Sequence, residues 1–203
     1  MKPGKLRICI DPKHLNQNIK RSHYLLPTIE DLLPDLSKAK IFSVVDAKNG
    51  FWHVELDDES SFGCYRWLRM PFGISSAPEE YQRRQDQTVE GLSGVRSIID
   101  DILIYGEGDI EEEALADHDV KFRALMECCK ERNLKLNKDK FSLKMKEVKF
   151  IEHLITSKGL KPDPEKARAI LDMPKPTNIS GVRRIIGFVT YQSKFLPKLS
   201  DIC

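Results

Sequence analysis

Short apolar runs separated by polar, turn-forming residues make up much of the chain. Runs rich in β-branched residues, and runs in which apolar and polar residues alternate, are typical of β-strands. By this criterion we predict strands at 6–10, 41–45, 51–56, 95–105 and 141–145, and a hairpin over 148–155. Turn-like residues at 48–50 separate the second and third of these.

Apolar residues spaced three and four apart predict helices in the remaining segments. Pro78, followed by two glutamates, favours a helix start at Ala77 and an end near Val89. A longer helix is predicted at 111–133, with His118, Phe122, Leu125, Met126 and Cys129 on one stripe. Two more follow: one is capped by residues 163–165 and ends before Pro174, and the other is capped by Ser180. Mixed strands and helices followed by helices predict an α+β fold.

Composition narrows the class of protein. The 203 residues suffice for one large domain or two small ones. No apolar stretch approaches the ~20 residues of a membrane span, and the first ten residues lack the long apolar region of a signal peptide. The five cysteines are odd in number and lack metal-ligand spacing, so we expect reduced thiols in an intracellular protein.

Charge is unevenly distributed although the net charge is only +2. Lysine and arginine are concentrated in 1–24, 130–149 and 161–198, whereas acidic residues dominate 107–119. Basic ends around an acidic middle suit a groove for a polyanion with carboxylates at its floor. A solvated surface of uneven charge explains the same pattern, and charge alone favours that interpretation.

Three carboxylates interrupt or end apolar runs. Asp100 and Asp101 lie within SIIDDILIY, and Asp46 ends IFSVVD. Taken alone, the adjacent pair is most simply a two-residue hairpin turn. If the strand that carries Asp46 pairs beside this hairpin, however, the three charges meet at one sheet edge and require cations. Two Mg²⁺ ions roughly 4 Å apart, shared with substrate phosphates, are the known solution for nucleotidyl transfer.

Four motifs occur in one order: VVDAKNGFWHV, YRWLRMPFGISSAPEEYQR, IIDDILIYG and LKLNKDKFSLKMKEVKFIEH. Together they resemble the reverse transcriptase domain of gypsy-type LTR retrotransposons, and the resemblance extends over nearly the whole chain. It implies a right-hand polymerase fold whose antiparallel palm sheet carries the catalytic carboxylates. We expect an incomplete fingers region at 1–19 and 56–76, the palm at 20–55 and 77–153, and the thumb at 154–203.

The resemblance implies a role for individual residues. Asp46, Asp100 and Asp101 match the palm carboxylates that bind two Mg²⁺ ions, and the Ala47 carbonyl would join one ion. The residues implied to bind the incoming deoxynucleoside triphosphate (dNTP) are Arg7, Ala47, Asn49, Gly50, Phe51 and Phe72.

Within that set, Arg7 would grip the triphosphate, because a planar guanidinium matches phosphate oxygens. The Phe51 ring would occupy the space of a ribose 2′-hydroxyl and so act as a steric gate. Without the family context, Phe51 and Phe72 are core aromatics and Arg7 is a surface arginine.

Residues implied to contact the template–primer lie further along the chain. Arg183, Gly187 and Tyr191 are spaced four apart, which places them on one helix face that the family lays in the minor groove. A solvated helix face is the alternative interpretation. Ile151 and Glu152 match the primer-grip hairpin, where the family usually has glycine in place of Glu152; a Cβ is unfavourable there if the turn needs a positive φ.

The chain also departs from the family's length. Phe62 is joined to Tyr65 by two residues, where the family carries an additional apolar strand. We therefore expect an internal deletion in the fingers and a truncated copy, without the RNase H and integrase regions of a parent polyprotein.

The expected activity is RNA-directed DNA synthesis. The partners implied are an RNA or DNA template with its primer, dNTPs and Mg²⁺, in the cytoplasm, or in a virus-like particle for an intact element. Two alternatives stay open: a catalytically inactive remnant that binds nucleic acid, and a decayed fragment of an element.

Overall fold

A four-stranded antiparallel sheet forms the centre of the protein. The computed structural model describes residues 9–21, 23–56, 61–62, 65–192 and 195. The strand order is β4-β5-β1-β6, built from β1 (Ala39–Asp46), β4 (Val95–Ile98), β5 (Asp101–Glu107) and β6 (Ser142–Met145). The sequence predicted all four strands, and the α+β fold class is confirmed.

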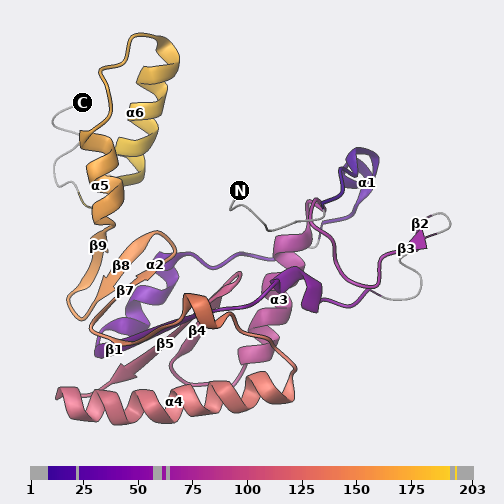
Figure 1. Cartoon of the computed structure of the whole chain (residues 1–203). Coiled ribbons are helices and arrows are strands. Elements are labelled where there is room, and N and C mark those ends of the chain that lie inside the picture. Colours follow the sequence, from indigo (N-terminus) through magenta and orange to yellow (C-terminus); the bar gives the residue numbers. More distant parts are fainter. Residues whose placement is uncertain (1–8, 22, 57–60, 63–64, 193–194, 196–203) are drawn as a thin grey trace.

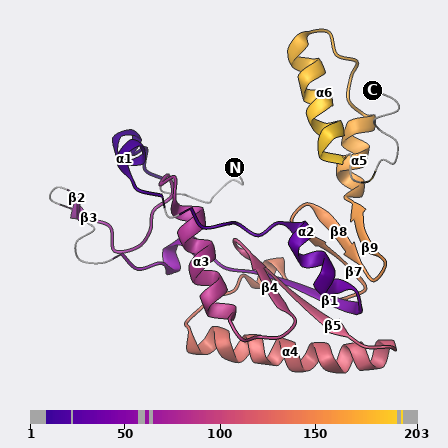
Figure 2. The same cartoon turned by 180° about the vertical axis from the view of Figure 1, so that it is seen from behind.

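Both faces of this sheet are covered, which explains why its central strands are apolar along their length. On one face, Ile102 and Ile104 pack against α3 (Ala77–Val89) and α4 (Glu111–Glu131). On the other, Leu103 and Tyr105 pack against α2 (Ile29–Leu32), η1 (Leu33–Leu36) and the small sheet of β7, β8 and β9. Figures 1 and 2 show α4 running along one side of the central sheet, with α2 on the other.

The helices agree closely with the sequence pattern. The α3 helix spans the predicted residues, and the apolar stripe of α4 is buried at His118, Leu125 and Cys129. The α4 helix ends at Glu131, two residues early, since Asn133 adopts a φ of +53°. Inside the core, the Ser43 hydroxyl lies 2.8 Å from His118 Nε2, which ties β1 to α4. Both side chains are fully buried, so this pair is structural.

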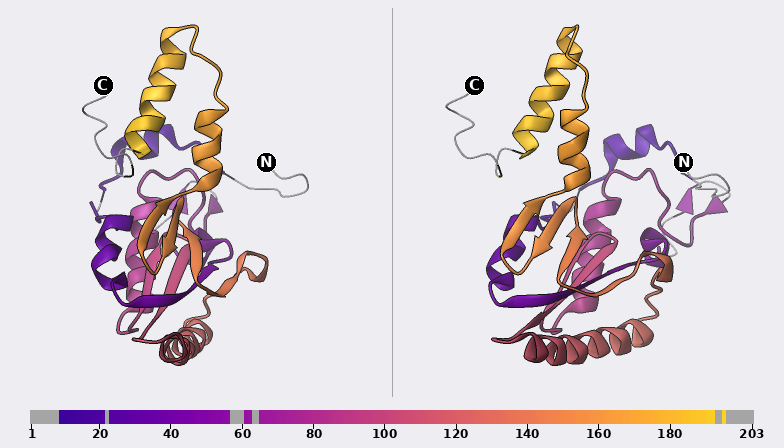
Figure 3. Two further views of the ribbon diagram at one scale, coloured as in Figure 1. Left: turned by 90° about the vertical axis from the view of Figure 1, so that its left-hand side faces the viewer. Right: turned by 60° about the vertical axis from the view of Figure 1, so that its left-hand side comes forward.

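The two C-terminal helices stand away from the central sheet, whereas the small sheet before them packs against it. Strands β7 (Glu147–Phe150), β8 (His153–Thr156) and β9 (Gly159–Pro162) lead into α5 (Pro164–Leu171) and α6 (Ile179–Gln192), which project beyond them (Figure 3). Asp163 caps α5 by accepting the Glu165 N–H at 3.0 Å. The predicted Ser180 cap of α6 is wrong, because Asn178 accepts the Gly181 N–H at 2.8 Å and the helix begins at Ile179, two residues earlier than a Ser180 cap implies.

The segment after β1 corrects a second prediction. Residues 51–56 do not form one extended piece, because Asn49 turns the chain with a φ of +57° and η2 (Gly50–His53) is a 3₁₀ helix. Only the end of the segment is extended, where Val54 and Leu56 exchange backbone hydrogen bonds with Met70 and Leu68.

The remaining elements are short. They are α1 (Lys13–Asn18), η3 (Lys138–Lys140), and the antiparallel pair β2 (Ser61–Phe62) and β3 (Tyr65–Arg66). No helix among the described residues is both long and apolar enough to span a membrane.

Candidate active site

The three carboxylates meet at one edge of the central sheet. Asp46, the last residue of β1, lies directly opposite Asp101, the first residue of β5. The Ala47 N–H donates to the Asp100 carbonyl at 2.7 Å, which fixes the hairpin against the end of β1. The convergence expected from the sequence is therefore present in the structure.

The hairpin turn lies one residue earlier than the sequence pattern predicted. Its two central residues are Ile99 and Asp100, because Ile98 pairs with Asp101. Ile99 adopts a φ of +52°, which is uncommon for a β-branched residue. The Gln82 side chain holds this conformation by accepting the Ile99 N–H at 2.6 Å. Of the two adjacent aspartates, Asp100 therefore belongs to the turn and Asp101 belongs to the strand.

A lysine supplies part of the positive charge that these carboxylates need. Lys140, from η3, forms an ion pair with the buried Asp46 carboxylate. Its hydrogen bond to Asp46 raises the pKa of the Lys140 ammonium. Burial, together with the nearby Asp46 charge, raises the pKa of Asp101. Sequence reasoning missed Lys140, which is one of several lysines in 130–149 and lies far from Asp46 along the chain.

The donor chemistry of this edge fits a hard cation. Carboxylate oxygens and a backbone carbonyl are the ligands that Mg²⁺ prefers. Within the described ranges, however, no three carboxylate, imidazole or thiol groups form a ready-made metal cluster. Lys140 occupies one Asp46 oxygen, Oδ2, so an ion that uses this oxygen would displace the lysine.

Gly50 and three aromatic rings adjoin the carboxylates. A Cβ on the buried Gly50 would overlap Asp100 Oδ1 and come within 2.5 Å of the Tyr81 ring, so this position requires glycine. The Phe51 ring lies 5.1 Å from the Phe72 ring and 5.4 Å from the Tyr81 ring, centroid to centroid. The structure therefore brings Gly50, Phe51 and Phe72 together, while Asn49 is exposed beside them.

Tyr81 is a further residue of this site that sequence reasoning missed. Burial and the neighbouring Asp100 and Asp46 carboxylates raise the pKa of its hydroxyl. The sequence shows Tyr81 as an apolar position on the 77–89 helix and as part of the motif that ends in EEYQR, and neither feature places it beside the carboxylates. Arg7 lies outside the described residues, although nearby Ile10 donates its N–H to the Phe72 carbonyl at 2.8 Å.

The residues expected to contact the template–primer lie apart from the carboxylates. Arg183 and Gly187 are exposed on α6, and a Cβ at Gly187 would meet nothing within 4 Å. The Tyr191 side chain lies outside the described part. Ile151 and Glu152 form the β7–β8 turn with φ values of +43° and +64°, so this turn does place a non-glycine residue in the left-handed region.

Replacing Glu152 by glycine is expected to stabilise the protein. A left-handed φ costs a non-glycine residue about 1 kcal/mol, so the free energy of unfolding should rise by about that amount in urea titrations. The matched control is Lys158→Gly in the neighbouring β8–β9 turn, where φ is not positive. It should lower stability slightly, and a gain equal to that of Glu152→Gly would show that backbone strain at Glu152 is not the cause.

Solved structures show which fold this is. The chain superposes with a TM-score of 0.86 on a foamy viral protease-reverse transcriptase in complex with double-stranded DNA. The two are 21% identical, and the match covers 100% of this chain and 43% of the other. A foamy viral structure with an RNA/DNA hybrid gives a TM-score of 0.72 at 20% identity, over 90% of this chain and 25% of that one. The architecture is therefore that of a right-hand polymerase.

The sequence defines the family. Residues 1–155 match the model of the reverse transcriptase (RNA-dependent DNA polymerase) family, so the chain belongs to that family. It is 32% identical to the retrovirus-related Pol polyprotein from transposon 297 of Drosophila melanogaster, over 98% of this chain and 19% of the polyprotein. It is 33% identical to the transposon Tf2-3 polyprotein of Schizosaccharomyces pombe, over 99% of this chain and 15% of that one.

These relatives confirm the resemblance to LTR retrotransposons that the motifs indicated. The chain spans less than a fifth of the length of either polyprotein.

Proposed function

We propose that this chain is an RNA-directed DNA polymerase domain of a retrotransposon, which adds dNTPs to a primer 3′-hydroxyl. The observation that carries the proposal is the meeting of Asp46, Asp100 and Asp101 at one sheet edge, beside a glycine and an aromatic cluster. Membership in the reverse transcriptase family supports it.

Different residues of the site would bind the metal ions and the nucleotide. Asp46, Asp100, Asp101 and the Ala47 carbonyl would hold two Mg²⁺ ions, and Lys140 would release Asp46 as they bind. When bound, such ions lower the pKa of the attacking hydroxyl and neutralise the triphosphate. Gly50 lets the Asp100 carboxylate and the Tyr81 ring lie close to its backbone, and the N–H groups of Asn49 and Gly50 would bind the phosphates of the nucleotide.

Nucleic acid would be held by the C-terminal region. The foamy viral neighbours contain double-stranded DNA or an RNA/DNA hybrid, which supports the same class of ligand here. We assign template–primer contacts to Arg183, Gly187 and Tyr191 on α6 and to the Ile151–Glu152 turn. In this assignment 154–203 is the thumb, 20–55 and 77–153 are the palm, and 1–19 and 56–76 are the fingers.

Binding and synthesis, measured in parallel, test the proposal. The protein should bind a DNA primer annealed to an RNA template and extend it when Mg²⁺ and dNTPs are added. Retained, salt-sensitive binding without extension would instead identify the inactive remnant. A non-cooperative melt, unchanged by the hybrid, would identify the decayed fragment.

The Phe51 ring is expected to exclude ribonucleotides. Removing it with Phe51→Ala should reduce the preference for dNTPs over ribonucleotides at least ~10-fold, because a steric clash then disappears. Phe51→Tyr keeps the ring and should keep the preference. Single-nucleotide incorporation rates provide the measurement, and an active Phe51→Ala variant with unchanged sugar selection would refute the gate.

A further inference from the structure

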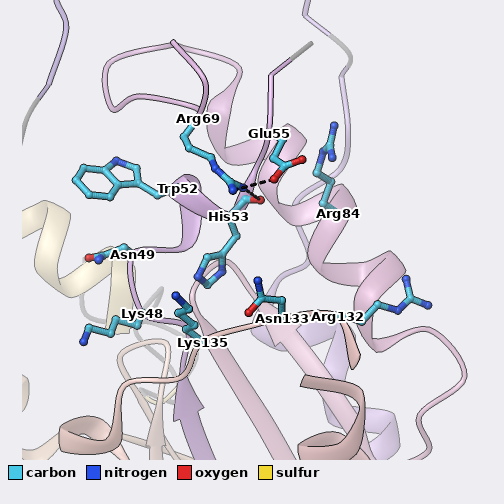
Figure 4. Close-up of a pocket in the computed structure, with 10 residues that line it drawn as sticks. All are labelled: Lys48, Asn49, Trp52, His53, Glu55, Arg69, Arg84, Arg132, Asn133 and Lys135. Atoms are coloured by element: carbon cyan, nitrogen blue, oxygen red, sulfur yellow. Dashed lines mark hydrogen bonds and ion pairs between the residues drawn. The ribbon is translucent and has the colours of Figure 1, made fainter. Parts of the chain in front are cut away.

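A basic pocket lies beside the candidate active site, in the region where η2, the end of α4 and α3 meet (Figure 4). Its volume is about 650 Å³, within the usual range for ligand pockets. The five cations around it are Lys48, Arg69, Arg84, Arg132 and Lys135. The Lys48 N–H donates to the Lys135 carbonyl at 2.8 Å, so a backbone bond joins two of its walls.

Two of these cations are paired with acids, and three are not. Arg69 pairs with Glu55 at 2.8 Å and Arg84 with Glu80 at 2.7 Å. Among the residues that the structure describes, Lys48, Arg132 and Lys135 form no side-chain ion pair. Like charges gathered around one pocket repel each other and attract anions.

His53 lines the same pocket, and its pKa is lowered first by burial and then by the Lys135 and Arg69 charges. Figure 4 shows its ring directed toward Lys135 and Asn133. A neutral imidazole adds no charge of its own, so the cationic side chains dominate the pocket.

An exposed aromatic ring completes the pattern. Trp52 is 43% exposed and lines the pocket on the side of Asn49. Its backbone N–H donates to the Asn49 carbonyl at 2.9 Å, which fixes the backbone of Trp52 next to Asn49. Cations that follow a phosphate backbone, together with an aromatic ring on which a base stacks, form the usual binding surface for single-stranded nucleic acid.

We propose that this pocket is a second nucleic-acid site, which binds single-stranded RNA or DNA. Lys48, Arg132 and Lys135 contact successive phosphates, and Trp52 stacks on a base. The site is separate from the contacts assigned to α6 and to the β7–β8 turn, and its occupancy does not require polymerase activity.

Trp52 fluorescence tests the proposal directly. The chain has two tryptophans, so Trp67→Phe leaves Trp52 as the only reporter. Adding single-stranded oligo(dT) should quench Trp52 emission in a saturable manner. In the same background, Arg132→Gln with Lys135→Gln should weaken binding at least ~10-fold. It should also reduce the salt dependence, by about 0.7 in the log–log slope for each lost phosphate contact.

Matched variants distinguish binding at this pocket from a general effect of charge and from binding at α6. Lys38→Gln with Arg123→Gln removes two exposed charges elsewhere and should change the affinity for oligo(dT) less than twofold.

Arg183→Gln should weaken binding of the RNA/DNA hybrid but leave oligo(dT) quenching intact. Failure of the polymerase proposal can therefore be distinguished from failure of the second-site proposal. Absent quenching, or equal losses in the two double variants, would overturn the second site. Tripolyphosphate binding as tightly as the oligonucleotide would overturn it in favour of a simple anion pocket.

Discussion

Asp101→Asn is expected to abolish nucleotide incorporation while making the ion-free protein more stable. Asp101 lies opposite Asp46, and burial raises its pKa, so the fold disfavours its charged form. Asparagine has nearly the same shape without the charge. We expect the free energy of unfolding to rise by on the order of 1 kcal/mol, or a few degrees in Tm.

The stability effect has a definite pH dependence. Because the folded-state pKa is raised, the cost of ionised Asp101 is absent below the ordinary value of 3.8. It grows as pH rises and is complete above the folded-state pKa. The stability gain of Asp101→Asn should therefore be present at neutral pH and vanish in acid, as followed by urea titration at several pH values.

Catalysis should change in the opposite direction. Losing a carboxylate ligand should lower the incorporation rate at least ~10³-fold, which corresponds to about 4 kcal/mol of transition-state stabilisation. Asp109→Asn, at an exposed position just beyond β5, is the matched control and should change neither stability nor rate. A stable Asp101→Asn variant that still incorporates nucleotides would exclude Asp101 from the reaction.

Gly50→Ala should have the second-largest effect. The added Cβ would overlap Asp100 Oδ1 and crowd the Tyr81 ring, and both neighbours belong to the site. Overpacking of this kind costs about 1–3 kcal/mol, so unfolding should occur at lower urea concentration and incorporation should fall with it.

Gly187→Ala is the matched control for Gly50→Ala. Nothing lies within 4 Å of a Cβ at Gly187, and alanine favours a helix by about 0.5–1 kcal/mol. The two glycine variants should therefore change the free energy of unfolding in opposite directions. A loss of stability in both would show that crowding at Gly50 is not the cause.

The regular elements could be predicted from the sequence because their signals are local. The bounds of α3 follow from Pro78, the following acids and the apolar spacing, and the strands follow from β-branched runs. The meeting of Asp46 with Asp101 required only that β1 pair with the hairpin. At these elements, the local sequence pattern and the tertiary packing favour the same secondary structure.

Some of the errors lie where distant groups decide the local conformation. Ile99 reaches a positive φ because Gln82, on another element, accepts its N–H. The error at 51–56 has a local cause, because Asn49 adopts a left-handed φ and a 3₁₀ helix follows it in place of the predicted extended segment. The Lys140–Asp46 ion pair joins residues that no local pattern connects. The spacing of Arg183, Gly187 and Tyr191 places them on one face of α6, but the spacing does not identify the ligand that binds this face.

Primer extension measured against Mg²⁺ concentration tests the central claim most directly, namely that Asp46, Asp100 and Asp101 form a two-ion nucleotidyl-transfer site. The wild-type chain should add dNTPs to a DNA primer on an RNA template, at a rate that rises with Mg²⁺ and stops on chelation. Asp100→Asn should bind the same hybrid without extending it. Extension by Asp100→Asn at the wild-type rate, or no extension by a wild-type chain that binds the hybrid, would contradict the account.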